Sequence, residues 1–343
     1  MNIGVLTGGG DCPGLNAAIR AVVKRAVGGF NYNVSGIKYG WKGLIEGLYM
    51  PLDMNSVSGI LDKGGTVLGT SRTNPFKDQE RLNILLDNIK TAMFDALIVI
   101  GGEDTLGVAE RLNREHNIPL VGIPKTIDND LSETDYSIGF WSSIHTAVEA
   151  IDRLRTTAES HNRVMIAEVM GRHAGWIATY AGICSGADIV LIPEIEMSIG
   201  EIIKILNKRI KRGRDFTIIV VAEGTKLKEM DEFVSKMKTD EFGHVYLGGI
   251  GNFLADEIEK RTGIDTRSTI LGYIQRGGQA VPFDRYLGTI LGISAVDLIT
   301  EGKFGYMVAL KGQEVVPVPL STVINHIKKV DKKLYNIAKI FFG

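Results

Sequence analysis

The sequence predicts an α/β fold whose mainly parallel sheets are covered by helices on both faces. Two observations lead to this prediction: short runs rich in β-branched residues alternate with amphipathic segments, and glycine pairs follow several of these runs. The chain has 343 residues, 44% of them hydrophobic, so it can build a sizeable core and by its length favours two domains. A disordered or fibrous protein is therefore excluded.

The expected strands are short apolar runs, and the segments between them carry apolar residues at helical spacing. We expect strands at residues 3–7, 33–38, 96–100, 120–123, 164–169, 189–192, 216–222 and 268–271. We expect helices at residues 15–27, 105–113, 142–156, 199–212 and 251–261. Because strands and helices alternate, the connections are crossovers and the strands should run parallel.

The composition excludes several classes of protein. The 39 Lys and Arg residues offset the 40 Asp and Glu residues, so the whole chain does not attract nucleic acid or an anionic membrane. Cys12 and Cys184 are too few for a disulfide framework, and no Cys/His spacing indicates structural zinc. We expect no export signal and no membrane span, because the first residues lack a charged n-region and a long apolar h-region and no later stretch approaches ~20 apolar residues. We expect a cytoplasmic protein, with residues 225–243 as an exposed insertion.

A glycine loop follows the first expected strand. Gly8, Gly9 and Gly10 lead through Pro13 into a helix that starts near residue 15. The N–H groups of such a loop and the positive end of a helix attract phosphate. The spacing fits neither the dinucleotide fingerprint nor the P-loop, and a tight turn is the alternative.

Two more loops carry charged residues. The loop 64–72 ends in Arg72, whose planar guanidinium suits phosphate, with a surface ion pair as the alternative. Glu103 and Asp104 follow the strand at 96–100, where a carboxylate can hold a hard cation or cap the next helix.

The loop after the strand at 120–123 is the most informative. It places Lys125, Thr126, Asp128 and Asp130 within six residues. Asp and Asn are also common in ordinary turns, which remains the alternative. Phosphoryl transfer needs a base for the attacking hydroxyl and positive charge on the migrating group, and this loop holds both.

Six ordered segments resemble the phosphofructokinase family over roughly residues 1–320. They are residues 8–16, 101–105, 124–130, 168–173, 222–224 and 271–278. The resemblance implies two Rossmann-like three-layer domains with the active site in the cleft between them. It implies a phosphoryl-donor and Mg²⁺ domain of residues 1–139 and 252–302, and a sugar-phosphate domain of residues 140–251 and 303–320. Residues 321–343 would form a solvated C-terminal helical tail.

The resemblance also implies roles for individual residues. Asp128 is implied as the general base that takes the proton from O1 of fructose 6-phosphate, with Thr126 binding substrate and Asp130 in a supporting role. Glu103 takes the position of the acid that holds Mg²⁺, where Asp is commoner in nucleotide-using relatives. Because Glu is one methylene longer, both a direct and a water-bridged contact stay open.

The resemblance also implies which residues bind the sugar phosphate. Several of them are arginines, whose guanidinium groups suit a phosphate dianion. The implied ligands are Thr126, Asp128, Arg163, Met170, Gly171, Arg172, Glu223, Arg267, Tyr273 and Arg276. Tyr273 stands where histidine is usual, and a phenol can donate a hydrogen bond but carries no positive charge. In relatives Arg163 and Arg267 reach in from a neighbouring subunit, so a homodimer or homotetramer with shared active sites is implied.

The phosphoryl donor is predicted from Asp104 and Lys125, where nucleotide-using members typically have glycine. A carboxylate at Asp104 should repel the α-phosphate of ATP by about 4 kcal/mol at ~4 Å and an effective dielectric of 20. Lys125 can place an ammonium on pyrophosphate and stabilise the transition state. Together with Gly10 and Arg72 as further donor ligands, these residues resemble pyrophosphate-dependent members, which implies a reversible reaction with Mg²⁺.

Two alternatives stay open at this point: an ATP-dependent phosphofructokinase, and a non-catalytic sugar-phosphate sensor that keeps the pockets without turnover. A binding module needs no general base, which argues against the sensor. We also expect weak or absent allostery, because Met54 stands where relatives with an effector site have an arginine.

Overall fold

The computed structural model describes residues 1–228 and 248–342, so most of the expected insertion at 225–243 lies outside the described residues. The chain forms two compact units. The first comprises Met1–Ile127, Leu131–Ser142 and Arg276–His326, and the second comprises Asp128–Asp130, Ser143–Gln275 and Ile327–Gly343. None of the described helices is long and apolar enough to cross a membrane.

The first unit is built on a seven-stranded sheet in the order β11-β10-β5-β4-β1-β2-β3. Its strands are β1 (Asn2–Thr7), β2 (Asn33–Ile37), β3 (Tyr49–Leu52), β4 (Ala96–Gly101), β5 (Leu120–Pro124), β10 (Tyr306–Lys311) and β11 (Glu314–Pro319). The five strands from β10 to β2 run parallel, whereas β3 and β11 are antiparallel edge strands. The strands β4 and β5 are buried throughout, as strands covered on both faces are.

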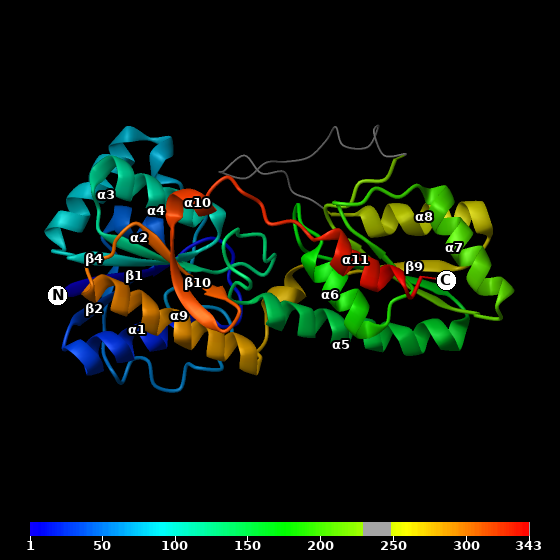
Figure 1. The fold of residues 1–343 in the computed structure, drawn as a ribbon, viewed down its shortest axis with the longest axis horizontal. Helices are drawn as coiled ribbons and strands as arrows, with labels where there is room; N and C mark the ends of the chain where they lie inside the picture. The colour runs from blue at the N-terminus through cyan, green and yellow to red at the C-terminus, as the bar shows by residue number, and fades with distance from the viewer. Residues whose placement is uncertain (229–247, 343) are drawn as a thin grey trace. The chain divides into compact units, whose positions relative to one another are not determined.

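Helices cover both faces of this sheet. They are α1 (Leu15–Phe30), α2 (Trp41–Glu46), α3 (Gln79–Thr91), α4 (Glu103–His116), α9 (Pro282–Thr300) and α10 (Leu320–Val323). In Figure 1, α1 and α9 lie side by side on one face, and α2, α3 and α4 lie on the other. The layers are therefore helix, sheet and helix.

The second unit is built on a parallel sheet in the order β7-β8-β6-β9. Its strands are β6 (Val164–Val169), β7 (Ile189–Leu191), β8 (Thr217–Ala222) and β9 (Thr266–Ile270). Its helices are α5 (Phe140–His161), which begins in the first unit, α6 (Trp176–Ser185), α7 (Ile199–Lys211), α8 (Ile250–Thr262) and α11 (Lys332–Lys339). Buried residues of α7 and α8 pack on β6, β7 and β8 to form its core.

The α/β prediction with mainly parallel sheets is confirmed, and each expected strand and helix is present, the strand at 164–169 with the predicted ends and the others with shifted ends. The predicted domain boundaries differ from the compact units. Strands β10 and β11 extend the first sheet through β5, so residues 303–320 belong to the first unit. Helix α8 and strand β9 pack on β6, so residues 252–275 belong to the second unit, whereas residues 276–302 belong to the first as predicted.

The C-terminal tail is not a separate solvated helix. Residues 321–326 belong to the first unit, and α11 packs on α6 and β7 of the second. Tyr335 is buried, and its hydroxyl donates to the carbonyl oxygen of Val190 at 2.9 Å. The four lysines suggested a solvated face, but the apolar side of α11 finds a partner.

Candidate active site

Three loops of the first unit meet where neighbouring strands end. The parallel strands β5, β4 and β1 are adjacent, so the loops that follow them leave from one edge of the sheet. The N–H of Gly8 donates to the carbonyl oxygen of Ile100 at 2.9 Å. The N–H of Lys125 donates to the carbonyl oxygen of Gly101 at 3.0 Å. The structure therefore brings these three predicted loops together.

The loop 64–72 joins the same group. The N–H of Gly9 donates to the carbonyl oxygen of Ser71 at 3.0 Å, and the hydroxyl of Thr70 donates to the carbonyl oxygen of Gly9 at 2.6 Å. Arg72, which is half-buried, follows directly after these contacts. These contacts could not be predicted from the sequence, because the loop 64–72 does not directly follow a strand that ends at this edge of the sheet.

Lys125 carries its cation onto the glycine loop. The residue is only 3% exposed, and its Nζ donates to the carbonyl oxygen of Gly10 at 2.6 Å. An ammonium held beside loop backbone at the end of parallel strands provides local positive charge for a phosphate anion.

Arg276 also contacts this loop. Its Nη1 donates to the carbonyl oxygen of Asp11 at 3.2 Å. A Cβ atom on Gly10 would lie 2.5 Å from that Nη1, so position 10 has to be glycine for the guanidinium to stay. The first unit therefore collects two cations, Lys125 and Arg276, at one glycine loop.

Two acids stand at the start of α4. Glu103 and Asp104 form its first turn, both half-buried, and the N–H of Asn325 donates to Oε1 of Glu103 at 3.1 Å. Within residues 1–228 and 248–342, no group of three or more His, Cys, Asp or Glu side chains could hold a metal ion. Mg²⁺ in phosphoryl-transfer sites is bound by one or two carboxylates with phosphate oxygens and water, which Glu103 fits.

The loop 124–130 divides between the two units. Thr126 lies in the first unit, where its carbonyl oxygen accepts from the hydroxyl of Ser137 at 2.6 Å. Asp128 lies in the second unit and is 4% exposed. A buried carboxylate of this kind suits a general base better than a solvated turn residue would.

Three acids lie close enough to interact in the second unit. Burial, and next the charge of Asp128, raise the pKa of Glu223 to about 7, and Glu168 adds to this effect. The N–H groups of Arg172 and Gly171 act in the opposite direction because they donate to the Glu223 carboxylate. Glu223 therefore titrates near neutral pH.

The loop after β6 is held at both ends. The N–H groups of Gly171 and Arg172 donate to Oε1 of Glu223 at 3.3 and 3.0 Å. The N–H of Met170 donates to Oε1 of Gln275 at 2.8 Å. Gly171 has φ +148°, and a Cβ there would lie 2.5 Å from a carbonyl oxygen three residues on, so only glycine fits. The predicted residues Met170, Gly171, Arg172 and Glu223 are thus brought together.

Arg163 and Arg267 lie at the other end of the same sheet. Arg163 precedes β6, whereas Met170 follows it, and the strand between them spans about 20 Å. Arg267 neighbours the start of β6 through its pairing with Met165. Both guanidinium groups form ion pairs with Asp265. The two arginines therefore cannot reach a ligand held by the loop after β6 in the same unit.

Tyr273 is 72% exposed. It follows β9 in the short 3-10 helix Gly272–Arg276. Its exposed neighbour Ile274 is 66% accessible, whereas Gln275 is fully buried. The segment thus presents two large side chains outward and one amide inward.

Replacing Glu223 with glutamine should change how stability depends on pH. The ordinary pKa of 4.5 applies in the unfolded chain, and the folded pKa is raised to about 7, so the fold favours the protonated acid. That contribution is fully present below pH 4.5 and is lost as pH rises through about 7. Wild type should lose roughly 1–3 kcal/mol relative to the variant between pH 5 and 8 in urea unfolding. Parallel pH profiles would contradict the shift.

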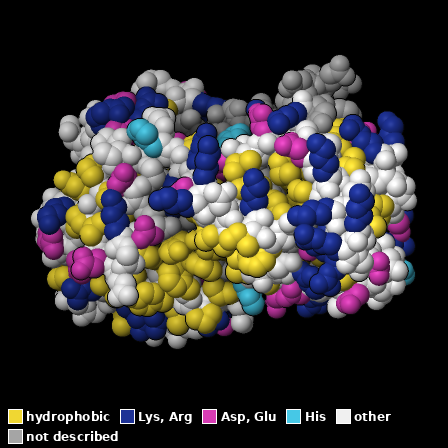
Figure 2. Space-filling view, turned by 45° about the vertical axis from the view of Figure 1, so that its right-hand side comes forward, with side chains coloured by type: hydrophobic (Ala, Val, Ile, Leu, Met, Phe, Trp, Pro, Cys, Tyr) yellow, Lys and Arg dark blue, Asp and Glu magenta, His cyan; other side chains and the backbone are white. Residues whose placement is uncertain are grey.

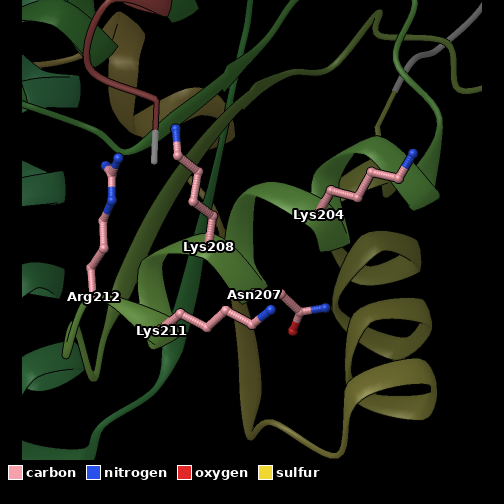
Figure 3. A pocket seen from close by; sticks show the side chains of 5 residues that line it. All are labelled: Lys204, Asn207, Lys208, Lys211 and Arg212. Atoms are coloured by element: carbon pink, nitrogen blue, oxygen red, sulfur yellow. The ribbon is translucent and has the colours of Figure 1, made fainter.

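A second group of cations lies in the second unit, on α7 and at the residue that follows it. Figure 2 shows Lys and Arg side chains gathered on parts of the visible surface despite the net charge of −1. A pocket of about 510 Å³ lies along this helix, and Figure 3 shows the side chains that line it. Its lining residues are Lys204, Asn207, Lys208, Lys211 and Arg212. It contains no acid, so it offers no base for phosphoryl transfer.

Two polar residues of the second unit, Glu168 and Gln275, form structural hydrogen bonds that were not predicted from the sequence. Glu168 is the next-to-last residue of β6, and its carboxylate accepts from the N–H groups of Gly249 at 3.0 Å and Gly251 at 2.8 Å. Gln275 links Met170 to Ser143: its Oε1 accepts from the N–H of Met170, and its Nε2 donates to the hydroxyl oxygen of Ser143 at 3.2 Å. An acid inside a wholly apolar strand was the available signal for Glu168. No comparable signal in the sequence pointed to Gln275, which stands between Ile274 and Arg276.

Comparisons with known proteins agree with this arrangement. The family described as Phosphofructokinase matches residues 2–299. A pyrophosphate–fructose 6-phosphate 1-phosphotransferase of Streptomyces coelicolor is 51% identical over the full length of both chains. A protein of the same name from Dictyoglomus thermophilum is 50% identical over 100% of this chain and 99% of its own. An ATP-dependent 6-phosphofructokinase 2 of Streptomyces coelicolor is 47% identical, again over both full lengths.

Solved structures share the fold. A phosphofructokinase of Saccharomyces cerevisiae is 32% identical with a TM-score of 0.80, and the match covers 94% of this chain but 45% of that longer one. A pyrophosphate-dependent phosphofructokinase of Nitrosospira multiformis has a TM-score of 0.85 over 100% of this chain and 92% of its own, at 20% identity. At that identity the likeness concerns the fold alone.

Proposed function

Because this chain belongs to the phosphofructokinase family, we propose that it transfers a phosphoryl group from pyrophosphate to O1 of fructose 6-phosphate. The products are fructose 1,6-bisphosphate and phosphate. Relatives that are 46–47% identical carry ATP-dependent names, so overall identity separates the donors only weakly. The observation that carries the choice is the pair Asp104 and Lys125, with the Lys125 ammonium on the glycine loop.

The proposed reaction assigns one task to each charged group. Asp128 takes the proton as O1 attacks the terminal phosphorus, and the bond from that phosphorus to the bridging oxygen breaks to release phosphate. Lys125 and Arg72 bind the diphosphate and offset the charge that spreads over its oxygens. Glu103 would hold Mg²⁺, which, when bound, neutralises phosphate charge. Asp104 leaves no favourable place for an α-phosphate.

The sugar phosphate is proposed to bind the loop after β6. Gly171, Arg172 and Glu223 already share hydrogen bonds there, and Met170 is held by Gln275. A carboxyl that titrates near neutral pH can donate to or accept from a sugar hydroxyl. A cytoplasmic location and weak or absent allosteric control remain predictions of this proposal.

Shared active sites are proposed from the position of Arg163 and Arg267. If these arginines bind the sugar phosphate, they must serve the site of another subunit, because about 20 Å of β6 separates Arg163 from the loop after it. A homodimer or homotetramer provides this arrangement through its symmetry.

Mixing two inactive variants should therefore restore activity. Asp128→Asn and Arg163→Ala damage different sites of a mixed dimer, so one site in each heterodimer is intact. Equal co-expression should restore about a quarter of wild-type activity if pairing is random. Asp128→Asn mixed with Lys125→Met is the control, because both residues come from the same chain's loop and no intact site can form. No recovery in the first mixture would contradict sharing through Arg163.

Direct product analysis tests the proposed function. Purified protein is incubated with Mg²⁺, pyrophosphate and fructose 6-phosphate, and phosphorus NMR follows the reaction. Equal amounts of fructose 1,6-bisphosphate and orthophosphate are expected. Binding of the sugar phosphate without any new phosphorus resonance would instead support the sensor.

A further inference from the structure

Residues 325–330, between α10 and α11, lie beyond the part of the chain that the family match covers. We call this segment the C-terminal strap, and in Figure 1 it is the orange to red coil between those helices. It passes from the first unit to the second at residue 327. Four of its backbone groups form hydrogen bonds with residues of the proposed machinery or with residues next to it.

The first contact is to the loop of the proposed base. The N–H of Lys328 donates to the carbonyl oxygen of Asp130 at 2.7 Å. Asp130 lies two residues after Asp128, and the segment Asp128–Asp130 packs as part of the second unit. Asn129 between them has φ +51°, a left-handed backbone conformation. A hydrogen bond at the end of this segment limits where the Asp128 carboxylate can lie.

The second contact is to the helix that follows the sugar-phosphate loop. Trp176, the first residue of α6, donates its indole Nε1–H to the carbonyl oxygen of Lys328 at 2.7 Å. The N–H of Val330 donates to Oε1 of Glu194 at 2.9 Å, and the same oxygen accepts from the N–H of Gly175 at 3.0 Å. One carboxylate thus joins the strap to the end of the loop that begins at Met170.

The third contact is to the proposed magnesium acid. The N–H of Asn325 donates to Oε1 of Glu103 at 3.1 Å. Both residues belong to the first unit. This bond occupies one carboxylate oxygen and so orients the other.

Buried residues flank the strap on both sides, whereas residues 325–327 and 329 within it are exposed. Val323 before it is fully buried, and Val330 at its end is 7% exposed. Beyond it, Tyr335 of α11 is buried and bonded to β7. Contacts at both ends keep the strap in place, as its role requires.

We propose that the C-terminal strap positions the proposed base and its neighbours for phosphoryl transfer, with Lys328 acting through its backbone. This inference rests on the proposed function. The strap touches no reacting atom, so its loss should slow the chemical step more than it weakens substrate binding. A displacement of about 1 Å at reacting groups can cost on the order of 100-fold in rate.

The test replaces Lys328 with proline, which removes the N–H that binds Asp130. Lys332→Pro is the matched control, because residue 332 is the first residue of α11, where a helix tolerates proline and needs no N–H. We expect Lys328→Pro to lower kcat at least tenfold while the KM values for pyrophosphate and fructose 6-phosphate change less than threefold. A folded Lys328→Pro enzyme whose kcat matches that of Lys332→Pro would overturn the proposal.

Two further measurements keep the test decisive. If Lys328→Pro does not fold, Trp176→Phe removes the indole donor but keeps an aromatic ring, and an unchanged kcat then overturns the role of the strap. Hydrogen exchange of peptides that contain residues 128–130 should be faster in Lys328→Pro than in Lys332→Pro. If the wild-type protein transfers no phosphoryl group, the proposed function fails. The hydrogen-exchange comparison then decides by itself whether the strap holds Asp130. Equal exchange in the two variants would show that it does not.

Discussion

Replacing Asp128 with asparagine is expected to lower kcat by about 100- to 10,000-fold, the usual contribution of a general base. Asparagine has almost the same shape, so fructose 6-phosphate binding should stay within a few fold of wild type. The residue is buried, and its charge is felt by Glu223. Removing that charge should therefore also lower the pKa of Glu223 below about 7.

Steady-state kinetics with binding by calorimetry separate these effects. Asp152→Asn, at an exposed position of α5, makes the same change away from the loops and should leave kcat unaltered. Turnover of Asp128→Asn at the wild-type rate would remove Asp128 from the base role, whereas loss of sugar binding would mean that it is mainly a ligand.

Replacing Lys125 with methionine is expected to lower kcat with pyrophosphate by about 100- to 1,000-fold, because a preorganised charge at the migrating group is lost. Methionine keeps most of the length of the buried side chain, so packing changes little. The measurement is the rate at saturating pyrophosphate, with the KM for the donor determined beside it.

Lys42→Met serves as the control, because Lys42 is half-exposed on α2 and pairs only with Glu46 at 3.7 Å among its described ion pairs. A rise in the KM for pyrophosphate with no fall in kcat would mean that Lys125 binds the donor equally in ground and transition states.

The sequence could place the loops of the first unit, because each follows a strand that its apolar run identifies. Parallel strands end on one edge, so Gly8, Glu103 and Lys125 had to lie near one another. The contact of Ser71 with the glycine loop could not be foreseen, because it depends on a loop that follows no strand of that edge.

The unit boundaries and the tail were beyond prediction for a related reason. Strand β10 joins the first sheet by pairing with β5, and its own residues do not indicate which strand it pairs with. The segment Asp128–Asp130 belongs to the second unit although its neighbours on both sides belong to the first. Long-range pairing decides both outcomes, whereas local patterns decide only that a strand or turn forms.

The donor can be probed directly at Asp104. Asp104→Gly removes the carboxylate that opposes an α-phosphate, and a repulsion of about 4 kcal/mol, weakened by solvent, should still leave at least a tenfold gain in the rate with ATP. Glu46→Gly removes an exposed acid from the same unit and should leave donor preference unchanged. An unchanged ATP rate in Asp104→Gly would contradict the assignment of Asp104 as the group that excludes ATP.

The most direct measurement compares initial rates of fructose 1,6-bisphosphate formation by the wild-type protein with Mg²⁺ and either pyrophosphate or ATP. Charged side chains at 104 and 125 predict that kcat/KM for pyrophosphate exceeds that for ATP by at least 100-fold, as a repulsion of about 4 kcal/mol implies. Equal rates, or a preference for ATP, would contradict the account.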